Sequence, residues 1–369
     1  MYNLRRAASL VGMTVALVVS SARGQGGYAG TTYDPASPDR RGQAGFTFLA
    51  IGGSARAEAM GGAFNAVQGD PSSVFYDVAG MASIPTGVNG YFCRTNWLSD
   101  MVIDHVMLGY KLSTVAVGLT FVSMDYGKIT GTIIDLTAPN GYVLTGTVKP
   151  GAWAIGTFLA LPVTDRFSFG LHVKYAVQDF GAQPYWVFLP GGTAGNYTYT
   201  AAGLRVSSFA FDVGTQYNIG VRDIMITMAL QNYARPKAFL DPDPPYRNGT
   251  FELPLTYRVG VAADVIELVS GLPNPQHQLC LIVDAIDARD ALLDAAVGVE
   301  YKANLSAAKD GLGVALRVGR RAGNQVGSLG FGGGISLPVA GVKLALDYSY
   351  GDYGDGFSAQ QWGFSVRLP

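Results

Sequence analysis

Charged residues are scarce in this chain of 369 residues: Asp, Glu, Lys and Arg make up 14% of it, against about 25% in a soluble globular protein. The formal net charge is -1. The chain therefore lacks the basic excess of a nucleic-acid-binding protein, and we expect no nucleic acid as a partner.

Cysteine is rare too. Cys93 and Cys280 stand in no metal or redox spacing, and we expect two unpaired thiols that behave as small apolar residues.

Residue patterns of catalytic chemistry are also missing. The three histidines, His105, His172 and His277, have no metal-ligand spacing with one another or with cysteine. The sequence contains no Gly-x-Ser-x-Gly element. The glycine pairs at 52–53 and 61–62 match neither the dinucleotide-binding nor the P-loop spacing. We expect no enzyme activity, no metal and no cofactor.

Long apolar runs are confined to the N-terminus. Arg5 and Arg6 precede an uncharged apolar run at 7–19, and small residues at 22–24 precede Gln25. This order predicts a signal peptide at 1–24. The apolar run is too short for a membrane-spanning helix, which needs about 20 apolar residues. Hydrophobic residues still make up 49% of the chain. High hydrophobicity without a spanning helix favours a β-barrel of the bacterial outer membrane, in contact with its lipid.

Alternation with a period of two dominates the rest of the chain. In Phe167 to Gln178 one parity is large and apolar and the other is small or charged. A strand sends these two sets to opposite faces. A soluble sandwich also alternates, but the large aromatic parity suits lipid and the small or charged parity suits a crowded lumen. Closure also removes the sheet edges that lipid does not tolerate.

The sequence therefore predicts an all-β protein: a transmembrane antiparallel β-barrel of roughly fourteen strands at 86–369, preceded by an N-terminal extension and plug at 25–85. The connections at 125–148, 181–204 and 235–252 are long, and with the N-terminus inside all of them fall on the outer side. The strands centre near residues 87–95, 103–111, 113–124, 149–162, 165–180, 205–218, 223–234, 253–268, 277–286, 292–303, 311–321, 327–337, 341–350 and 359–368.

Residues 55–82 do not alternate. They are rich in Ala and Gly, so their backbone can pack closely inside a filled lumen. Asp70 is expected to cap a short helix that begins at Pro71 and carries Val74 and Phe75 inward. Irregular backbone at membrane depth is tolerated only when protein surrounds it, which places this stretch inside the barrel.

The stretch "IGGSARAEAMGGAFNAVQGDPSSVFYDVAGMA" resembles the N-terminal signature of the PorV/PorQ family of outer-membrane barrels. Where that pattern has Asn-Pro, this chain has Asp77-Val78. The resemblance implies a role in protein secretion or surface attachment of the type IX kind, with secreted client proteins or secretion-system components as partners. The signature residues are Arg56, Met60, Gly61, Gly62, Phe64, Asp70, Asp77, Ala79 and Gly80.

The same architecture is similar to that of the FadL-type channels, which implies an alternative function: transport of a hydrophobic ligand such as a long-chain fatty acid. Aromatic residues of the outer connections are candidate partner or lipid contacts, namely Trp97, Tyr185, Trp186 and Phe188. Alternatively, the two strands on either side of the 181–204 connection extend upward, and Tyr185, Trp186 and Phe188 lie in an aromatic girdle at the outer interface.

Charges on the inward parity form the remaining candidate site. They can line a selective pore, or they can form an ion-pair network that fills the lumen around the plug, because buried charges need partners. The mixed signs favour the network. The residues are Lys174, Asp212, Arg258, Asp264, Asp284, Glu300, Lys302, Arg317, Lys343 and Asp347.

Overall fold

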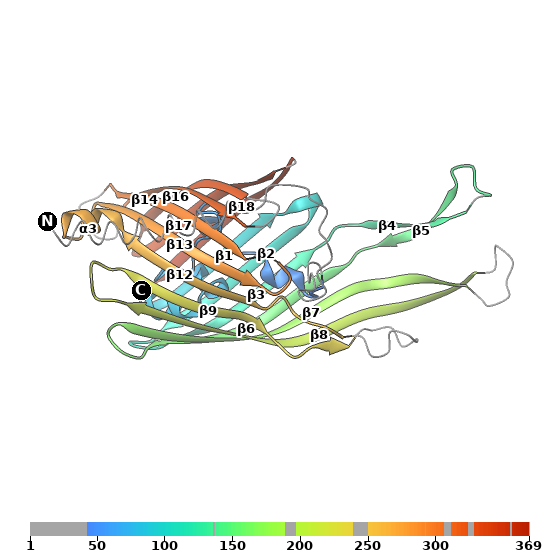
Figure 1. The fold of residues 1–369 in the computed structure, drawn as a ribbon, viewed down its shortest axis with the longest axis horizontal. Helices are drawn as coiled ribbons and strands as arrows, with labels where there is room; N and C mark the ends of the chain where they lie inside the picture. The colour runs from blue at the N-terminus through green and yellow to red at the C-terminus, as the bar shows by residue number, and fades with distance from the viewer. Residues whose placement is uncertain are drawn as a thin grey trace.

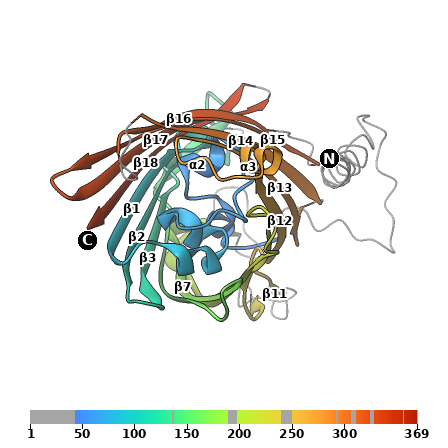
Figure 2. The ribbon, with the colours of Figure 1, turned by 90° about the vertical axis from the view of Figure 1, so that its left-hand side faces the viewer.

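A closed antiparallel barrel forms the body of the protein (Figures 1 and 2). The computed structural model describes residues 43–135, 137–188, 197–238, 250–291, 293–305, 311–323, 328–354 and 356–368. The expected signal peptide lies outside them. Within these ranges the barrel has fourteen strands, which confirms the predicted fold class. No helix in these ranges is long and apolar enough to span a membrane.

Each wall strand pairs with its neighbours along the wall, and β1 pairs with β18 to close it. The wall strands are β1 Gly87–Asn96, β2 Val102–Lys111, β3 Ala116–Asp125, β6 Gly151–Pro162, β7 Phe167–Phe188, β8 Tyr197–Asn218, β9 Met225–Tyr233, β12 Thr256–Asp264, β13 His277–Ala288, β14 Asp294–Asn304, β15 Gly313–Ala322, β16 Ser328–Val339, β17 Val342–Gly354 and β18 Phe357–Leu368.

The outer surface of the wall is apolar. On β2, Met107 is 1% exposed whereas its neighbour Leu108 is 56% exposed, and the same alternation exposes Leu119, Phe209 and Leu316. Exposure of such an apolar surface to water is unfavourable, whereas lipid solvates it. The protein is a barrel of the bacterial outer membrane.

The two ends of the barrel differ. One end carries short turns, the C-terminal strand end and helix α3 (Val265–Ser270); we call it the periplasmic end, because short turns face the periplasm in such barrels. The other, outer end carries the hairpin of β4 (Ile129–Ile134) and β5 (Tyr142–Val148) and the far ends of β7 and β8, which project well beyond the wall (Figure 1).

Two boundaries differ from the prediction. The connection expected at 181–204 is largely strand, because the β7–β8 pairing continues past an irregularity at Asp179 and Ala182. The two strands therefore extend upward as the alternative predicted, and its aromatic girdle stays a prediction. The strand expected at 253–268 ends at Asp264, because the Asp264 carboxylate accepts hydrogen bonds from the backbone N–H groups of Ile266 and Glu267 and starts α3. The two-residue strands β10 (Lys237–Ala238) and β11 (Thr250–Phe251) pair between β9 and β12.

Residues 43–86, which we call the plug, lie inside the barrel (Figure 2). They form short helices, three of which begin at a side-chain cap: Ser54 caps α2, Asp70 caps η2 and Asp77 caps η3. The cap by Asp70 before Pro71 is as predicted. The helices are η1 Thr47–Ala50, α2 Ala55–Glu58, η2 Pro71–Phe75 and η3 Val78–Ser83; η4 (Leu98–Asp100) follows β1.

Glycines of the wall let the plug backbone approach closely. A side chain at Gly298 would place its Cβ 2.6 Å from Met60 Cβ, and one at Gly319 would overlap the Met60 backbone. On the far side, a Cβ at Gly170 would lie 2.6 Å from the Ala79 nitrogen. These glycines occupy the inward parity, so one set of them seats α2 and another seats η3. The small residues that face the lumen thus form the surface against which the plug packs.

Candidate functional site: the plug and the lumen

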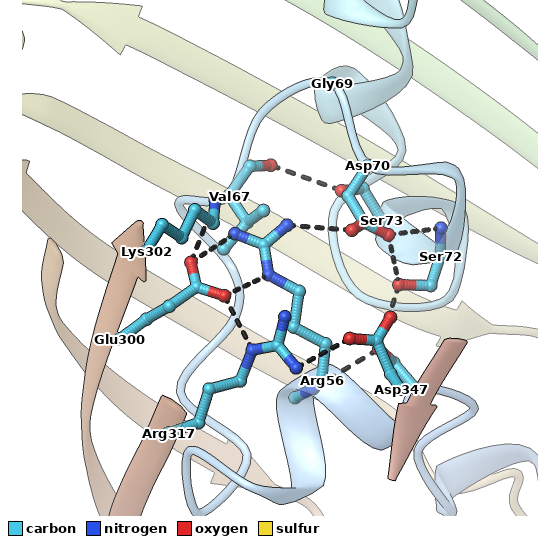
Figure 3. Close-up of polar contacts among 12 residues, drawn as sticks. Arg56, Val67, Gly69, Asp70, Ser72, Ser73, Glu300, Lys302, Arg317 and Asp347 are labelled. Atoms are coloured by element: carbon cyan, nitrogen blue, oxygen red, sulfur yellow. Dashed lines mark hydrogen bonds and ion pairs between the residues drawn. The ribbon is translucent and has the colours of Figure 1, made fainter. Parts of the chain in front are cut away.

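An ion-pair network joins the plug to the wall (Figure 3). Arg56, from α2, lies 2.7 Å from Asp70 and 2.6 Å from Glu300 of β14. Arg317 of β15 lies 2.6 Å from Glu300 and 2.6 Å from Asp347 of β17. Lys302 adds a contact of 3.0 Å to Glu300.

The network contains three cations and three carboxylates, and its central side chain, Glu300, is fully buried. Buried charges are tolerated when each is paired and hydrogen-bonded, and arginine forks match carboxylates bidentately. The alternative of an open pore lined by fixed charge does not describe these residues, because each is turned toward a partner. The network therefore connects α2 to the wall strands β14, β15 and β17.

A second polar cluster lies on the lumen side of the neighbouring strands β7, β8 and β9. The carboxylate of Asp212 lies 2.7 Å from Lys174 Nζ and 3.0 Å from His172 Nδ1, and it accepts a hydrogen bond of 2.7 Å from the Asn232 backbone N–H. Asn232 has a left-handed φ of 61°, where the β8–β9 register shifts. The cluster holds this bulge in β9.

The same cluster contains a hydroxyl, an imidazole and a carboxylate in series. Thr120 Oγ1 lies 2.8 Å from His172 Nε2, and His172 reaches Asp212 through its other nitrogen. This order resembles that of a nucleophilic triad. All three side chains are buried, so a substrate has no access to the hydroxyl. The arrangement is structural.

Asp284 and Arg258 hold the middle of the plug. The Asp284 carboxylate accepts hydrogen bonds from the backbone N–H groups of Phe64 and Asn65, at 2.8 and 2.9 Å. The Arg258 guanidinium donates to Gln231 at 3.0 Å and lies 5.6 Å from the Tyr76 ring. These two wall side chains thus bind plug groups rather than a passing solute.

The other predicted lumen charges lie near the periplasmic end. Asp264 caps α3 instead of joining the network. Lys343 lies opposite Arg367 in the β17–β18 register and is half-buried.

The signature residues lie in the plug. Met60 and Phe64 are fully buried. Gly61 and Gly62 have φ values of 65° and 83°, a conformation that favours glycine, and a side chain at Gly61 would also meet the Arg320 backbone. Ala79 and Gly80 begin η3 behind the Asp77 cap.

The outer aromatic candidates divide into two groups. The Trp97 ring lies 5.3 Å from that of Tyr353, and the Tyr353 hydroxyl donates a 2.7 Å hydrogen bond to Glu58 of α2. Trp97 is therefore linked to the plug. Burial raises the pKa of the Glu58 carboxyl. The side chains of Tyr185, Trp186 and Phe188 lie outside the described ones, although the backbone places all three on β7.

Buried apolar side chains form three clusters in the described part of the chain. The outer apolar cluster is built around Phe46 and Phe48, both fully buried, and includes Ile103, Val122, Met124, Ala152, Ala154, Ala176, Ala210 and Leu253. The central apolar cluster contains Ala57, Met60, Ala63, Phe64, Ala66, Val67, Tyr76, Met225, Ala262, Ile282, Ile286 and Ala296. Phe46 and Phe48 were not among the predicted site residues, although they alternate just before the signature.

Within the ranges that the structure covers, no three His, Cys, Asp or Glu side chains gather in a way that could hold a metal ion. Cys93 and Cys280 are unbonded; Cys93 is buried and Cys280 is half-buried.

Comparison with known proteins supports the fold. No protein-family model and no curated protein sequence matches the chain. The toluene transporter TbuX of Ralstonia pickettii matches with a TM-score of 0.56 and 13% identity, over 85% of this chain and 96% of that one. The monoaromatic hydrocarbon channel CymD matches with a TM-score of 0.54 and 11% identity, over 86% and 96%. The toluene transporter TodX of Pseudomonas putida gives 0.53 and 10%, over 85% and 96%.

At these identities the likeness shows the fold alone: the chain has the same barrel fold as these three proteins. The resemblance to the PorV/PorQ family finds no support in these comparisons and rests on the signature residues.

Proposed function

We propose that this protein is an outer-membrane channel for hydrophobic small molecules. The outer apolar cluster carries the proposal: beneath the outer hairpins the lumen is lined by aliphatic side chains and filled by Phe46 and Phe48. A general diffusion porin has a polar, water-filled lumen instead. The fold shared with barrels described as toluene transporters and a monoaromatic hydrocarbon channel supports the same function.

The segment that fills the outer cluster is held by its two buried rings and by hydrogen bonds. Its polar anchors include a 2.9 Å hydrogen bond from the Gly45 N–H to the Glu252 carbonyl and a 3.2 Å bond from the Phe46 N–H to Gln178. Phe46 has a left-handed φ of 54°, which costs of order 1–3 kcal/mol for a residue other than glycine. A hydrophobic solute that takes the place of the two phenyl rings would release this strain. We infer that a solute enters by exchanging with the rings of Phe46 and Phe48.

Uptake tests the proposal. The full-length gene is expressed in a Gram-negative strain that lacks its own hydrophobic channels, and the initial rate of toluene entry is measured. We expect faster entry than in cells with an empty vector. Equal rates, with the barrel shown to be inserted by its heat-modifiable gel mobility, would refute the channel.

A second candidate function is the protein-binding role that the PorV/PorQ resemblance implies. The observation that favours it is the β4–β5 hairpin, on which Ile134 and Leu144 are 77% and 63% exposed, well outside the wall (Figure 1). Exposed apolar side chains on a projecting hairpin suit a partner protein. Deletion of residues 129–148 would then release surface proteins into the medium while leaving toluene entry unchanged. Retention of those proteins would count against this role.

A further inference from the structure

Two buried oxygen atoms at the contact between the plug and β8 have no hydrogen-bond partner among the described residues. They are Asp77 Oδ2 and Gln216 Oε1. Each side chain is 1% exposed, and the two lie within hydrogen-bond reach of each other. Asp77 lies directly against the wall, because a side chain at Gly214, two residues before Gln216, would overlap its carboxyl group. Buried polar atoms in proteins almost always have a partner, so this pair requires an explanation.

The other polar atoms of the two side chains already have partners. Asp77 Oδ1 accepts a hydrogen bond of 2.9 Å from the Ala79 N–H at the start of η3. The amide nitrogen of Gln216 donates to the backbone carbonyls of Asn65 and Val67, at 3.1 and 3.3 Å. The amide oxygen of Gln216 is therefore the atom left for Asp77. An ionised carboxylate only accepts hydrogen bonds, whereas a protonated one also donates. A proton on Asp77 Oδ2 would satisfy both oxygen atoms.

The charges around Asp77 favour this proton. The helix that Asp77 caps, η3, packs against η2, β6, β7 and β8, and the buried residues of β6 are Ala, Gly and Phe. The titratable side chains of the other surroundings are engaged with one another: Asp70 with Arg56, Asp212 with His172 and Lys174, and Tyr76 with Arg258.

Within the described residues, no cation forms an ion pair with Asp77. The carboxyl group of Asp284, on β13, also acts on Asp77 and disfavours a second negative charge there. Burial of a carboxylate without a cation is costly, so a group in this position keeps its proton.

We propose that Asp77 carries a proton while the plug is seated, and that this proton makes the contact between η3 and β8 sensitive to pH. The protonated carboxyl group donates a hydrogen bond to Gln216 Oε1 and so holds the start of η3 on the wall. At alkaline pH the proton passes to water, and the two oxygen atoms are then buried side by side with no hydrogen between them, which weakens the contact. This property belongs to the plug and does not depend on the solute that the barrel carries.

Infrared spectroscopy of the refolded full-length protein tests the proton directly, because protonated and ionised carboxyl groups absorb at different frequencies. The difference spectrum between wild type and Asp77→Asn at neutral pH is expected to show a protonated carboxyl group. The matched control is Asp70→Asn, because Asp70 caps η2 in the same way but binds Arg56; its difference spectrum should show an ionised carboxylate. An ionised carboxylate in the Asp77 spectrum would overturn the proposal.

Efflux of labelled sucrose from lipid vesicles that contain the barrel tests the dependence on pH. For the wild type we expect efflux to rise severalfold over the alkaline interval in which the infrared signal of Asp77 changes to that of a carboxylate. Asp77→Asn should stay as tight as the wild type at neutral pH, because an amide caps η3 and donates to Gln216 without a proton to lose. Asp77→Ser is a second variant that caps and does not titrate, and it should behave alike. If wild type and both variants leak equally, or if the wild type stays tight after Asp77 has ionised, the pH-sensitive contact is wrong.

Discussion

The guanidinium of Arg56 in the plug donates two hydrogen bonds, of 2.7 and 2.6 Å, to the carboxylate of Glu300 on β14. The two residues are 244 positions apart in sequence, and the carboxylate is fully buried. Glu300 also binds Arg317 and Lys302. A single wall side chain is therefore the centre of the contact that keeps α2 inside the barrel.

Glu300→Gln is expected to destabilise the protein strongly, because it leaves Arg56 and Arg317 buried with too little negative charge. Breaking a buried pair in this way costs about 3–5 kcal/mol. The control is Arg94→Gln, which removes an exposed bidentate pair of 2.8 Å with Asp104, where the loss should stay below about 1 kcal/mol. Urea unfolding of the refolded barrel in lipid vesicles measures both. Equal losses for the two variants would contradict a holding role for Glu300.

Gly319→Ala should unseat the plug, because the added Cβ would overlap the Met60 backbone. Gly333→Ala on the adjacent strand β16 is the matched control, since its nearest neighbour would be the Ala315 carbonyl oxygen at 3.2 Å. We expect cells with the first variant to admit a large hydrophilic antibiotic that the wild type and the control exclude. If cells with Gly319→Ala still excluded the antibiotic, the glycines would not be what holds α2 against the wall.

The number of strands and the face of each residue could be predicted from the sequence, because the alternation of lipid-facing and lumen-facing residues is local and has a period of two. The β7–β8 extension was left open, since a strand beyond the membrane faces water on both sides and loses the pattern. Asp264 has the inward parity, but a local cap competes with strand pairing at that residue. Parity identified Glu300 and Arg317 as inward, whereas the pairing of Glu300 with Arg56 depends on where the plug docks, which no local pattern encodes.

Phe48→Ala should open a binding site in the outer apolar cluster. Deleting a buried phenyl ring costs about 3–5 kcal/mol, and an apolar ligand that fills the space restores part of that stability. We expect toluene to raise the unfolding temperature of Phe48→Ala more than that of the wild type. Phe331→Ala removes an exposed ring from the lipid face and should show no added response. A toluene response equal in all three proteins would argue against the cluster as a solute site.

Glu58 gives the plug a dependence on pH. Burial raises the pKa of its carboxyl, and the hydrogen bond from Tyr353 opposes that rise. The folded state then binds this proton more tightly than the unfolded chain, so its contribution to the free energy of unfolding is largest at low pH. The contribution falls as the pH rises from the ordinary carboxyl value through the raised pKa. Glu58→Gln should remove this fall, and Tyr353→Phe should move it to higher pH. Urea unfolding across this pH range, compared between variants, measures the effect; a profile unchanged by Glu58→Gln would show that the carboxyl titrates alike in both states.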